Sequence, residues 1–94
     1  MTPKLSLIIS FYNKPDLLQR VLESIALQTM RDFEVVIADD GSKAEAVEQI
    51  DRMKKQFAFP IIHVWQADNG WQKNKILNKA VVAARGEYLV FIDG

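Results

Sequence analysis

Six side chains in this 94-residue sequence have the types and spacing that ligand chemistry needs. Each stands at the end of an apolar run that predicts a strand, and together they are Ser10, Tyr12, Asn13, Asp39, Asp40 and Asp93. An aromatic ring can stack on a base, and a carboxylate can accept a hydrogen bond from a base or ribose. A further carboxylate can bind a divalent cation on the phosphates. This combination favours a nucleotide site, although a plain turn or a helix cap would also explain the acidic residues.

The last eight residues carry the clearest of these patterns. Residues 88–92 are apolar, with β-branched and aromatic side chains among them, which predicts a strand buried on both faces. Asp93 and Gly94 then break the run. An acid where a buried parallel strand emerges is well placed to hold a metal or a ligand hydroxyl, although from the residue type alone a plain turn aspartate explains Asp93 equally well.

The elements that must position these groups alternate along the chain. Strands are predicted at residues 5–9, 33–38, 61–65 and 88–92, with helices after Asn13, from Ser42, and over 71–84. Short connections in a β-α-β-α-β-α-β pattern imply a three-layer α/β/α, Rossmann-like parallel sheet of about four strands in one domain, residues 1–94. A strand order of 3-2-1-4 would bring the polar strand ends into one crevice.

Local signals predict where the helices begin and end. Asn13 can cap the first helix, and Pro15 suits its first turn. Ser42 and Glu45 have the spacing of a capping box for the second helix. Gly86 follows the third helix in the manner of a C′ glycine.

Composition excludes several classes of function. Twelve basic and twelve acidic side chains balance, so no overall charge points to nucleic acid as a partner. The sequence has no cysteine, which favours a reducing compartment, and no apolar run approaches the length of a membrane span. Met1 leads quickly into the first strand, so we expect no signal peptide and a cytoplasmic location, membrane-peripheral at most in a full-length protein.

Two aromatic residues and one histidine have plainer interpretations. His63, inside the third predicted strand, is expected to be structural or on the surface, and Trp65 to pack in the core or at an edge. Trp71 lies by the mouth of the predicted crevice and is a candidate for ligand contact.

The sequence also resembles the family 2 glycosyltransferases of GT-A fold. The resemblance rests on blocks in the order that the family shows, and they touch nearly the whole chain: LSLIISFYNK (5–14), LESI (22–25), QT (28–29), DFEVVIADDGS (32–42), NKA (78–80) and ARGEYLVFIDG (84–94). No single block is specific, but their combination is. It implies the N-terminal half of a GT-A nucleotide-diphospho-sugar transferase, which moves a sugar from a nucleotide-diphosphate donor, usually a UDP-sugar, to an acceptor.

The resemblance also implies roles for individual residues. Tyr12 would pack on the uracil with Ser10 beside it, and Asp40 would contact the base or ribose. Asp93 would begin a D-x-D motif near the ribose and a divalent cation, Mn²⁺ or Mg²⁺, and the partner acid would follow Gly94.

A basic residue near the start of the third helix reaches the uracil or the diphosphate in the family, and Lys73 or Lys75 is the candidate here. The acceptor site and the catalytic base would lie beyond Gly94. We therefore expect the full-length protein to be an enzyme of glycan or polysaccharide synthesis and this chain alone to be inactive. The donor sugar and the glycan, lipid or protein acceptor stay open.

Other classes fit less well. A receiver-like signalling domain would place its acidic pair after the first strand, where this chain has Ser10 to Asn13. A dinucleotide oxidoreductase needs a glycine-rich first turn, and this turn has no glycine. A non-catalytic α/β nucleotide-binding or interaction module that kept the fold stays open as the alternative.

The last strand also raises an expectation about assembly. If it is an edge of the sheet, its apolar side chains and unpaired backbone have few charges to protect them, and we expect self-association through it.

Overall fold

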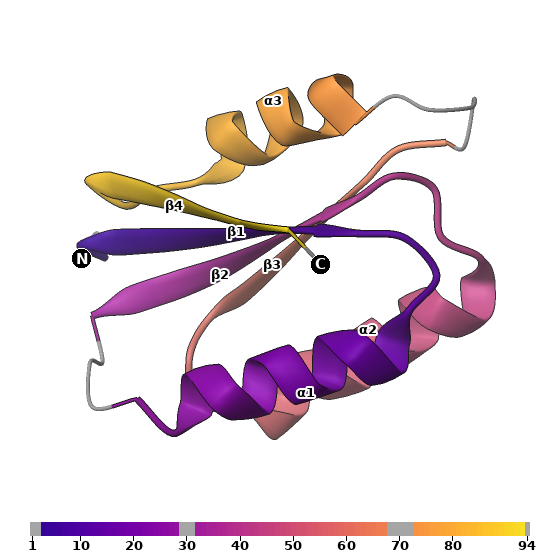
Figure 1. The fold of residues 1–94 in the computed structure, drawn as a ribbon, viewed down its shortest axis with the longest axis horizontal. Helices are drawn as coiled ribbons and strands as arrows, with labels where there is room; N and C mark the ends of the chain where they lie inside the picture. Colours follow the sequence, from indigo (N-terminus) through magenta and orange to yellow (C-terminus); the bar gives the residue numbers. More distant parts are fainter. Residues whose placement is uncertain (1–2, 29–31, 68–72, 94) are drawn as a thin grey trace.

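The strands and helices alternate along the chain in the predicted order (Figure 1). The structure is a computed structural model that describes residues 3–28, 32–67 and 73–93. Its elements are β1 (Leu5–Phe11), α1 (Pro15–Ala26), β2 (Phe33–Asp39), α2 (Ala44–Gln56), β3 (Ile61–Trp65), α3 (Lys73–Ala83) and β4 (Tyr88–Asp93). The strands form one parallel sheet in the order β3-β2-β1-β4, which confirms the predicted fold class.

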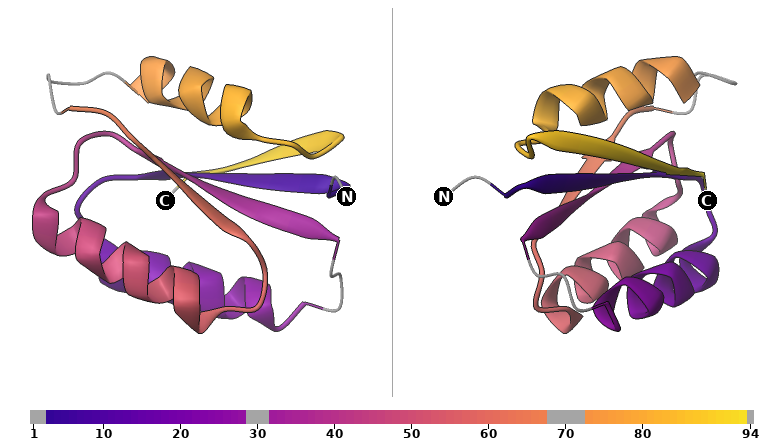
Figure 2. Two further views of the ribbon diagram at one scale, coloured as in Figure 1. Left: turned by 180° about the vertical axis from the view of Figure 1, so that it is seen from behind. Right: turned by 60° about the vertical axis from the view of Figure 1, so that its left-hand side comes forward.

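Helices cover both faces of this sheet. Figures 1 and 2 show α1 and α2 side by side on one face and α3 on the other. β2 lies between β1 and β3 under both layers, so every one of its residues is buried. None of the helices in the described part of the chain has the length and apolar content that a membrane crossing requires.

Each helical layer makes its own core with the sheet. Under α1 and α2, side chains such as Leu22, Ile37 and Ile50 pack together. Under α3, Val36 and Ile76 belong to a smaller cluster on the opposite face. Successive strand residues point to opposite faces, so neighbours such as Val36 and Ile37 belong to different cores.

β4 is exposed, and the prediction that it is buried on both faces was wrong. The strand order leaves it at an edge, and α3 packs over β1, β2 and β3 instead. Tyr88 is 61% exposed and Phe91 56%, although their side chains point to opposite faces of the sheet. An uninterrupted apolar run does not distinguish a central strand from an edge strand. The run is a local property of the sequence, whereas the strands that lie beside it come from distant parts of the chain.

Two predicted helix caps were also wrong. α1 begins after Lys14 and α2 after Lys43, and neither helix start has a side-chain cap hydrogen bond. Pro15 does occupy the first turn of α1. The predicted caps, Asn13 and Ser42, each lie one residue before the observed cap. The Asn13 N–H donates to the Ser42 hydroxyl, and the Asn13 side chain accepts the N–H of Lys43.

Gly86 does not end α3 as a C′ glycine, because the helix stops at Ala83. A Cβ at Gly86 would lie 2.5 Å from Oγ of Ser6 and 2.6 Å from its backbone nitrogen. Glycine is therefore needed here because the connection from α3 to β4 passes directly against β1.

Glu34 anchors that connection from within the sheet. Its buried Oε2 accepts hydrogen bonds from the Ser6 hydroxyl, 2.7 Å away, and from the backbone N–H of Arg85, 2.6 Å away. The Nε of Arg85 donates to Oε1 at 3.2 Å, and the N–H of Gly86 donates to Ser6 Oγ at 2.8 Å. Burial by itself would raise the pKa of Glu34, but the bonds from Arg85 and Ser6 and the charge of Arg85 outweigh it, and the pKa lies below its ordinary value of 4.5.

Candidate functional site

The carboxyl ends of β1, β2 and β4 meet at one edge of the sheet, as the strand order requires. Ser10 is paired with Ala38 of β2 on one side and with Asp93 of β4 on the other. Phe11 is paired with Asp39. The backbone thus brings together the strand ends that the sequence analysis singled out, at the edge where parallel α/β sheets bind ligands.

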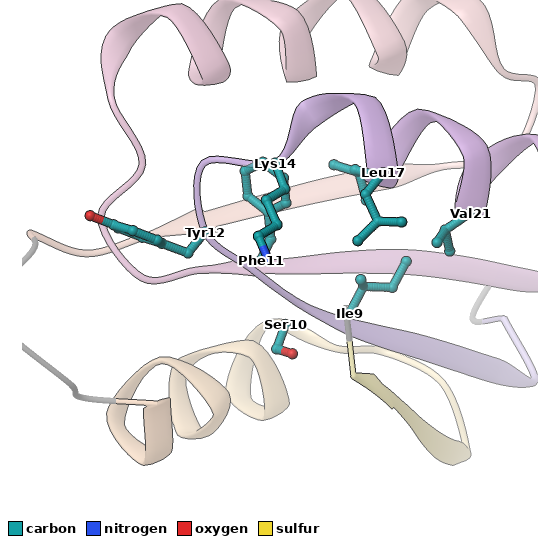
Figure 3. A pocket seen from close by; sticks show the side chains of 8 residues that line it. Ile9, Ser10, Phe11, Tyr12, Lys14, Leu17 and Val21 are labelled. Atoms are coloured by element: carbon teal, nitrogen blue, oxygen red, sulfur yellow. The ribbon is translucent and has the colours of Figure 1, made fainter.

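Tyr12 is an exposed aromatic residue at this edge, directly after β1. Its side chain is 45% exposed, whereas the preceding Phe11 is buried. Figure 3 shows Tyr12 extending away from the apolar part of a small pocket, where Leu17 and Val21 of α1 lie over Ile9. The Tyr12 ring can therefore be reached from solvent, as stacking on a base requires.

Ser10 lies on the opposite face of the sheet from Ile9. In Figure 3 its hydroxyl points toward the α3 side, and the residue is partly buried. It lies between the end of β2 and the end of β4.

Asp39 is buried and holds the turn after β2. Its Oδ1 accepts the backbone N–H of Ser42 at 2.9 Å, and its Oδ2 lies 2.8 Å from Nε2 of His63, which donates to it. Within the turn from Asp39 to Ser42, Gly41 adopts φ 90°, a conformation that favours glycine. A nucleotide contact by Asp39 stays a prediction, and in this structure both of its oxygens face protein groups.

Asp40 is the more accessible of the two acids. Its backbone N–H donates to the carbonyl of Phe11 at 3.1 Å, which fixes the turn against the end of β1. Its Oδ1 accepts a hydrogen bond from Nε2 of Gln66 at 2.8 Å. The side chain of Asp40 is partly exposed and that of Gln66 is buried, so a buried amide orients the carboxylate.

The loops after β1 and β2 are joined by a reciprocal pair of hydrogen bonds. The backbone N–H of Asn13 donates to Ser42 Oγ at 2.8 Å, and the N–H of Lys43 donates to Asn13 Oδ1 at 2.8 Å. Trp65 adds a third element, because its indole N–H donates to the carbonyl of Ser42 at 3.1 Å. We call Asn13, Ser42, Lys43 and Trp65 the loop bridge.

Of the four other predicted positions, one is described fully and three only in part or not at all. Lys75 lies in the first turn of α3 and is exposed. Lys73 starts α3 and Asp93 ends β4, but their side chains lie outside the described residues, as does Trp71 altogether. Their nucleotide and metal roles stay predictions.

A divalent cation has no ligand cluster among the described side chains. No group of three His, Asp or Glu residues there could hold one. The predicted ligand Asp93 is placed by its backbone alone, opposite Ser10.

Sequence reasoning did not predict the contacts that orient the acids. His63 was expected to be structural or on the surface, and its ring bonds Asp39. Trp65 was expected to pack in the core or at an edge; it ends the edge strand β3, is 48% exposed and donates a hydrogen bond to the loop after β2. Gln66 was not singled out, although its position directly after β3, the neighbour of β2, was a usable signal.

Comparison with known proteins agrees with this geometry. The model of the family described as "Glycosyl transferase family 2" matches residues 6–94. The protein EpsH of Bacillus subtilis (strain 168) is 38% identical over 94 residues, which cover 98% of this chain and 26% of EpsH. The chain thus spans about a quarter of the length of such a relative.

Solved structures show the same arrangement of elements. The mannosyltransferase PcManGT from Pyrobaculum calidifontis, in complex with GDP-Man and Mn²⁺, has a TM-score of 0.82 at 26% identity over 99% of this chain and 28% of its own. S. aureus TarS 1-349 in complex with UDP-GlcNAc has a TM-score of 0.74 at 27% identity, over 96% of this chain and 26% of that one. With the family match over residues 6–94, these likenesses lead to one conclusion: the chain belongs to glycosyl transferase family 2 and has the fold of the N-terminal part of its GT-A members.

Proposed function

We propose that the full-length protein transfers a sugar from a nucleoside diphosphate donor, a UDP-sugar, to a glycan, lipid or protein acceptor in glycan or polysaccharide synthesis. This chain would supply part of the donor site. The observation that carries the proposal is the pairing of an exposed aromatic ring, Tyr12, with an oriented carboxylate, Asp40, at the carboxyl edge of the sheet.

These two groups suit the two halves of a nucleoside. The ring of Tyr12 offers an apolar face on which a pyrimidine can stack. The carboxylate of Asp40 accepts hydrogen bonds, and a uracil ring N–H or a ribose hydroxyl would donate to it. Support from relatives comes from TarS, solved with UDP and with UDP-GlcNAc, and from PcManGT, solved with GDP-Man and Mn²⁺.

The metal part of the proposal rests on Asp93. A carboxylate there, opposite Ser10, would help to hold Mn²⁺ or Mg²⁺ beside the donor diphosphate. When bound, such an ion offsets negative charge on the departing diphosphate. The acceptor and the catalytic base would come from other parts of the full-length protein, so the 94-residue chain is proposed to bind donor without turnover.

Calorimetric titration of UDP, GDP and ADP, each with and without Mn²⁺, tests the donor site. We expect UDP to bind more tightly than ADP. Asp40→Ala should lower the affinity for UDP by about tenfold or more, because a hydrogen bond to a charged group contributes about 1.5–3 kcal/mol. Asp51→Ala is the matched control, because Asp51 is an exposed acid within α2, away from the strand ends. Equal affinities for the three nucleotides, or an Asp40→Ala chain that binds UDP as the wild type does, would contradict the proposal.

The alternative is a non-catalytic module that kept the nucleotide site or only the fold. Testing the full-length protein separates it from the transferase. A transferase hydrolyses or transfers the sugar of a UDP-sugar, and Asp93→Ala abolishes that turnover. A module binds nucleotide, if at all, without releasing UDP.

We also propose that the isolated chain self-associates through β4. The exposed apolar side chains of this edge strand, Phe91 at 56% and Val90 at 42%, support the idea. Sedimentation equilibrium should show a mass that rises with concentration, and Phe91→Lys should reduce the rise. A monomer at every concentration tested would count against this proposal.

A further inference from the structure

Asn13 stands next to the exposed Tyr12, yet its backbone N–H and its side-chain oxygen bond to the neighbouring loop. Its backbone N–H bonds to Ser42 Oγ and its Oδ1 accepts the N–H of Lys43, both at 2.8 Å. Asn13 also adopts φ 49°, the one positive φ of a non-glycine residue in the described part of the chain. Asparagine tolerates this left-handed conformation better than most residues, so residue type and backbone agree here.

Ser42 is the other end of this connection, and every polar group of its backbone and side chain has a partner. Its N–H donates to Asp39 Oδ1, its Oγ accepts from Asn13 and its carbonyl accepts from Trp65. The residue is buried. The loop bridge therefore joins the ends of β1, β2 and β3 through one residue.

The loop bridge adjoins, along the chain, the two groups that the donor site needs. Tyr12 directly precedes Asn13, and Asp40 lies two positions before Ser42, with its N–H on the carbonyl of Phe11. A change in the Asn13–Ser42 contact would therefore shift the ring of Tyr12 relative to the carboxylate of Asp40. Selectivity for one base depends on that relative position, because stacking and hydrogen bonding must be satisfied at once.

We propose that Asn13 is a positioning residue, and not a nucleotide ligand: with Ser42 it holds Tyr12 and Asp40 in the arrangement that selects the base. This inference rests on the proposed donor site. Asn13 acts through the hydrogen bonds of its Oδ1 and of its backbone N–H. The amide NH₂ of Asn13 has no part in this role.

Asn13→Asp keeps the acceptor oxygen and removes the NH₂ donor. Its carboxylate would face the N–H of Lys43 at the N-terminus of α2, where negative charge is favourable. Asn13→Gly keeps the freedom to adopt a positive φ and removes the acceptor. Ser42→Ala removes the other half of the reciprocal pair.

The readout is the ratio of the UDP and ADP affinities, measured by calorimetry on the 94-residue chain. Both ligands carry the same diphosphate, so any repulsion from a new carboxylate cancels in the ratio. We expect Asn13→Gly and Ser42→Ala to lower this ratio by about tenfold, the effect of one hydrogen bond, and Asn13→Asp to keep it within about twofold. Thermal melts of each variant set a temperature at which all are folded.

Two results would overturn the proposal. An Asn13→Asp chain that loses selectivity as fully as Asn13→Gly would make the amide NH₂ a ligand contact. Unchanged selectivity in Asn13→Gly and Ser42→Ala would show that the loop bridge does not position the site.

Amide hydrogen exchange without nucleotide tests the positioning separately from the donor site. We expect Ser42→Ala to speed exchange at Asn13, and Asn13→Gly to speed it at both Lys43 and Asp40, by about tenfold. If the wild-type chain binds neither UDP nor ADP, the proposed function fails, and hydrogen exchange alone then tests the positioning role of Asn13. An exchange rate at Asp40 that is the same in Asn13→Gly as in the wild type would overturn that role.

Discussion

Replacing Glu34 by alanine is expected to lower the free energy of unfolding by about 2–4 kcal/mol. The substitution leaves the Ser6 hydroxyl and the Arg85 N–H without their shared acceptor inside the sheet. Each unsatisfied buried donor costs about 1–3 kcal/mol, and the space left by the side chain adds to this. A small domain is stable by only about 5–15 kcal/mol, so chemical denaturation will show the change clearly.

Two matched variants separate the parts of this network. Arg85→Ala should cost less than about 1 kcal/mol, because its side chain is 55% exposed and its backbone N–H still reaches Glu34. The loss of stability in Glu34→Gln should lie between those of the other two variants. Its amide oxygen can still accept the hydrogen bonds from the Ser6 hydroxyl and the Arg85 backbone N–H, while its NH₂ faces the guanidinium. An Arg85→Ala loss as large as that of Glu34→Ala would assign the stability to the ion pair instead.

The pH dependence of this contribution has a definite sign. The pKa of Glu34 is lowered below 4.5 in the folded state, so folding favours the ionised form. Its contribution is complete above the unfolded-state value near 4.5 and is lost as pH falls through the lower folded pKa. The stability gap between wild type and Glu34→Gln should therefore narrow on acidification from pH 4.5, and a gap that stays constant would contradict the assignment.

Replacing Asp39 by alanine is the second change with a large expected effect, and it acts at the candidate site. His63 Nε2 and the Ser42 N–H lose their acceptor, and we expect about 2–3 kcal/mol of destabilisation. The turn that presents Asp40 loses its anchor as well. UDP binding should then fall by about tenfold or more, even at a temperature where the variant is folded.

Asp39→Asn is the matched control for this effect. The asparagine oxygen can still accept the N–H of Ser42, and its NH₂ can donate to Nε2 of a neutral His63 in the other tautomer. We therefore expect most of the stability and UDP affinity to survive. If Asp39→Asn lost UDP affinity as completely as Asp39→Ala at full stability, Asp39 would contact the nucleotide directly through its charge.

The sequence alone was sufficient for the order of elements, the parallel sheet and the edge at which the site lies. Apolar periodicity is a local property, and β1, β2 and β3 were predicted within a residue or two because each has its own run. Parallel strands joined by helices then leave few topologies, and 3-2-1-4 was the predicted and observed one. The family was also recognisable, because its blocks of residues survive in order.

Only the tertiary structure decided which of two residues close in sequence or alike in type is buried, exposed or hydrogen-bonded. Asp39 and Asp40 are alike in type, but alternation along β2 turns Asp39 onto the face of Val35 and Ile37, beside His63. Asn13 and Ser42 looked like caps of their own helices, yet they bond across 29 residues of sequence. The exposure of β4 and the buried contacts of Glu34 likewise depend on which strand lies beside which, and such long-range pairing leaves no periodic mark in the sequence.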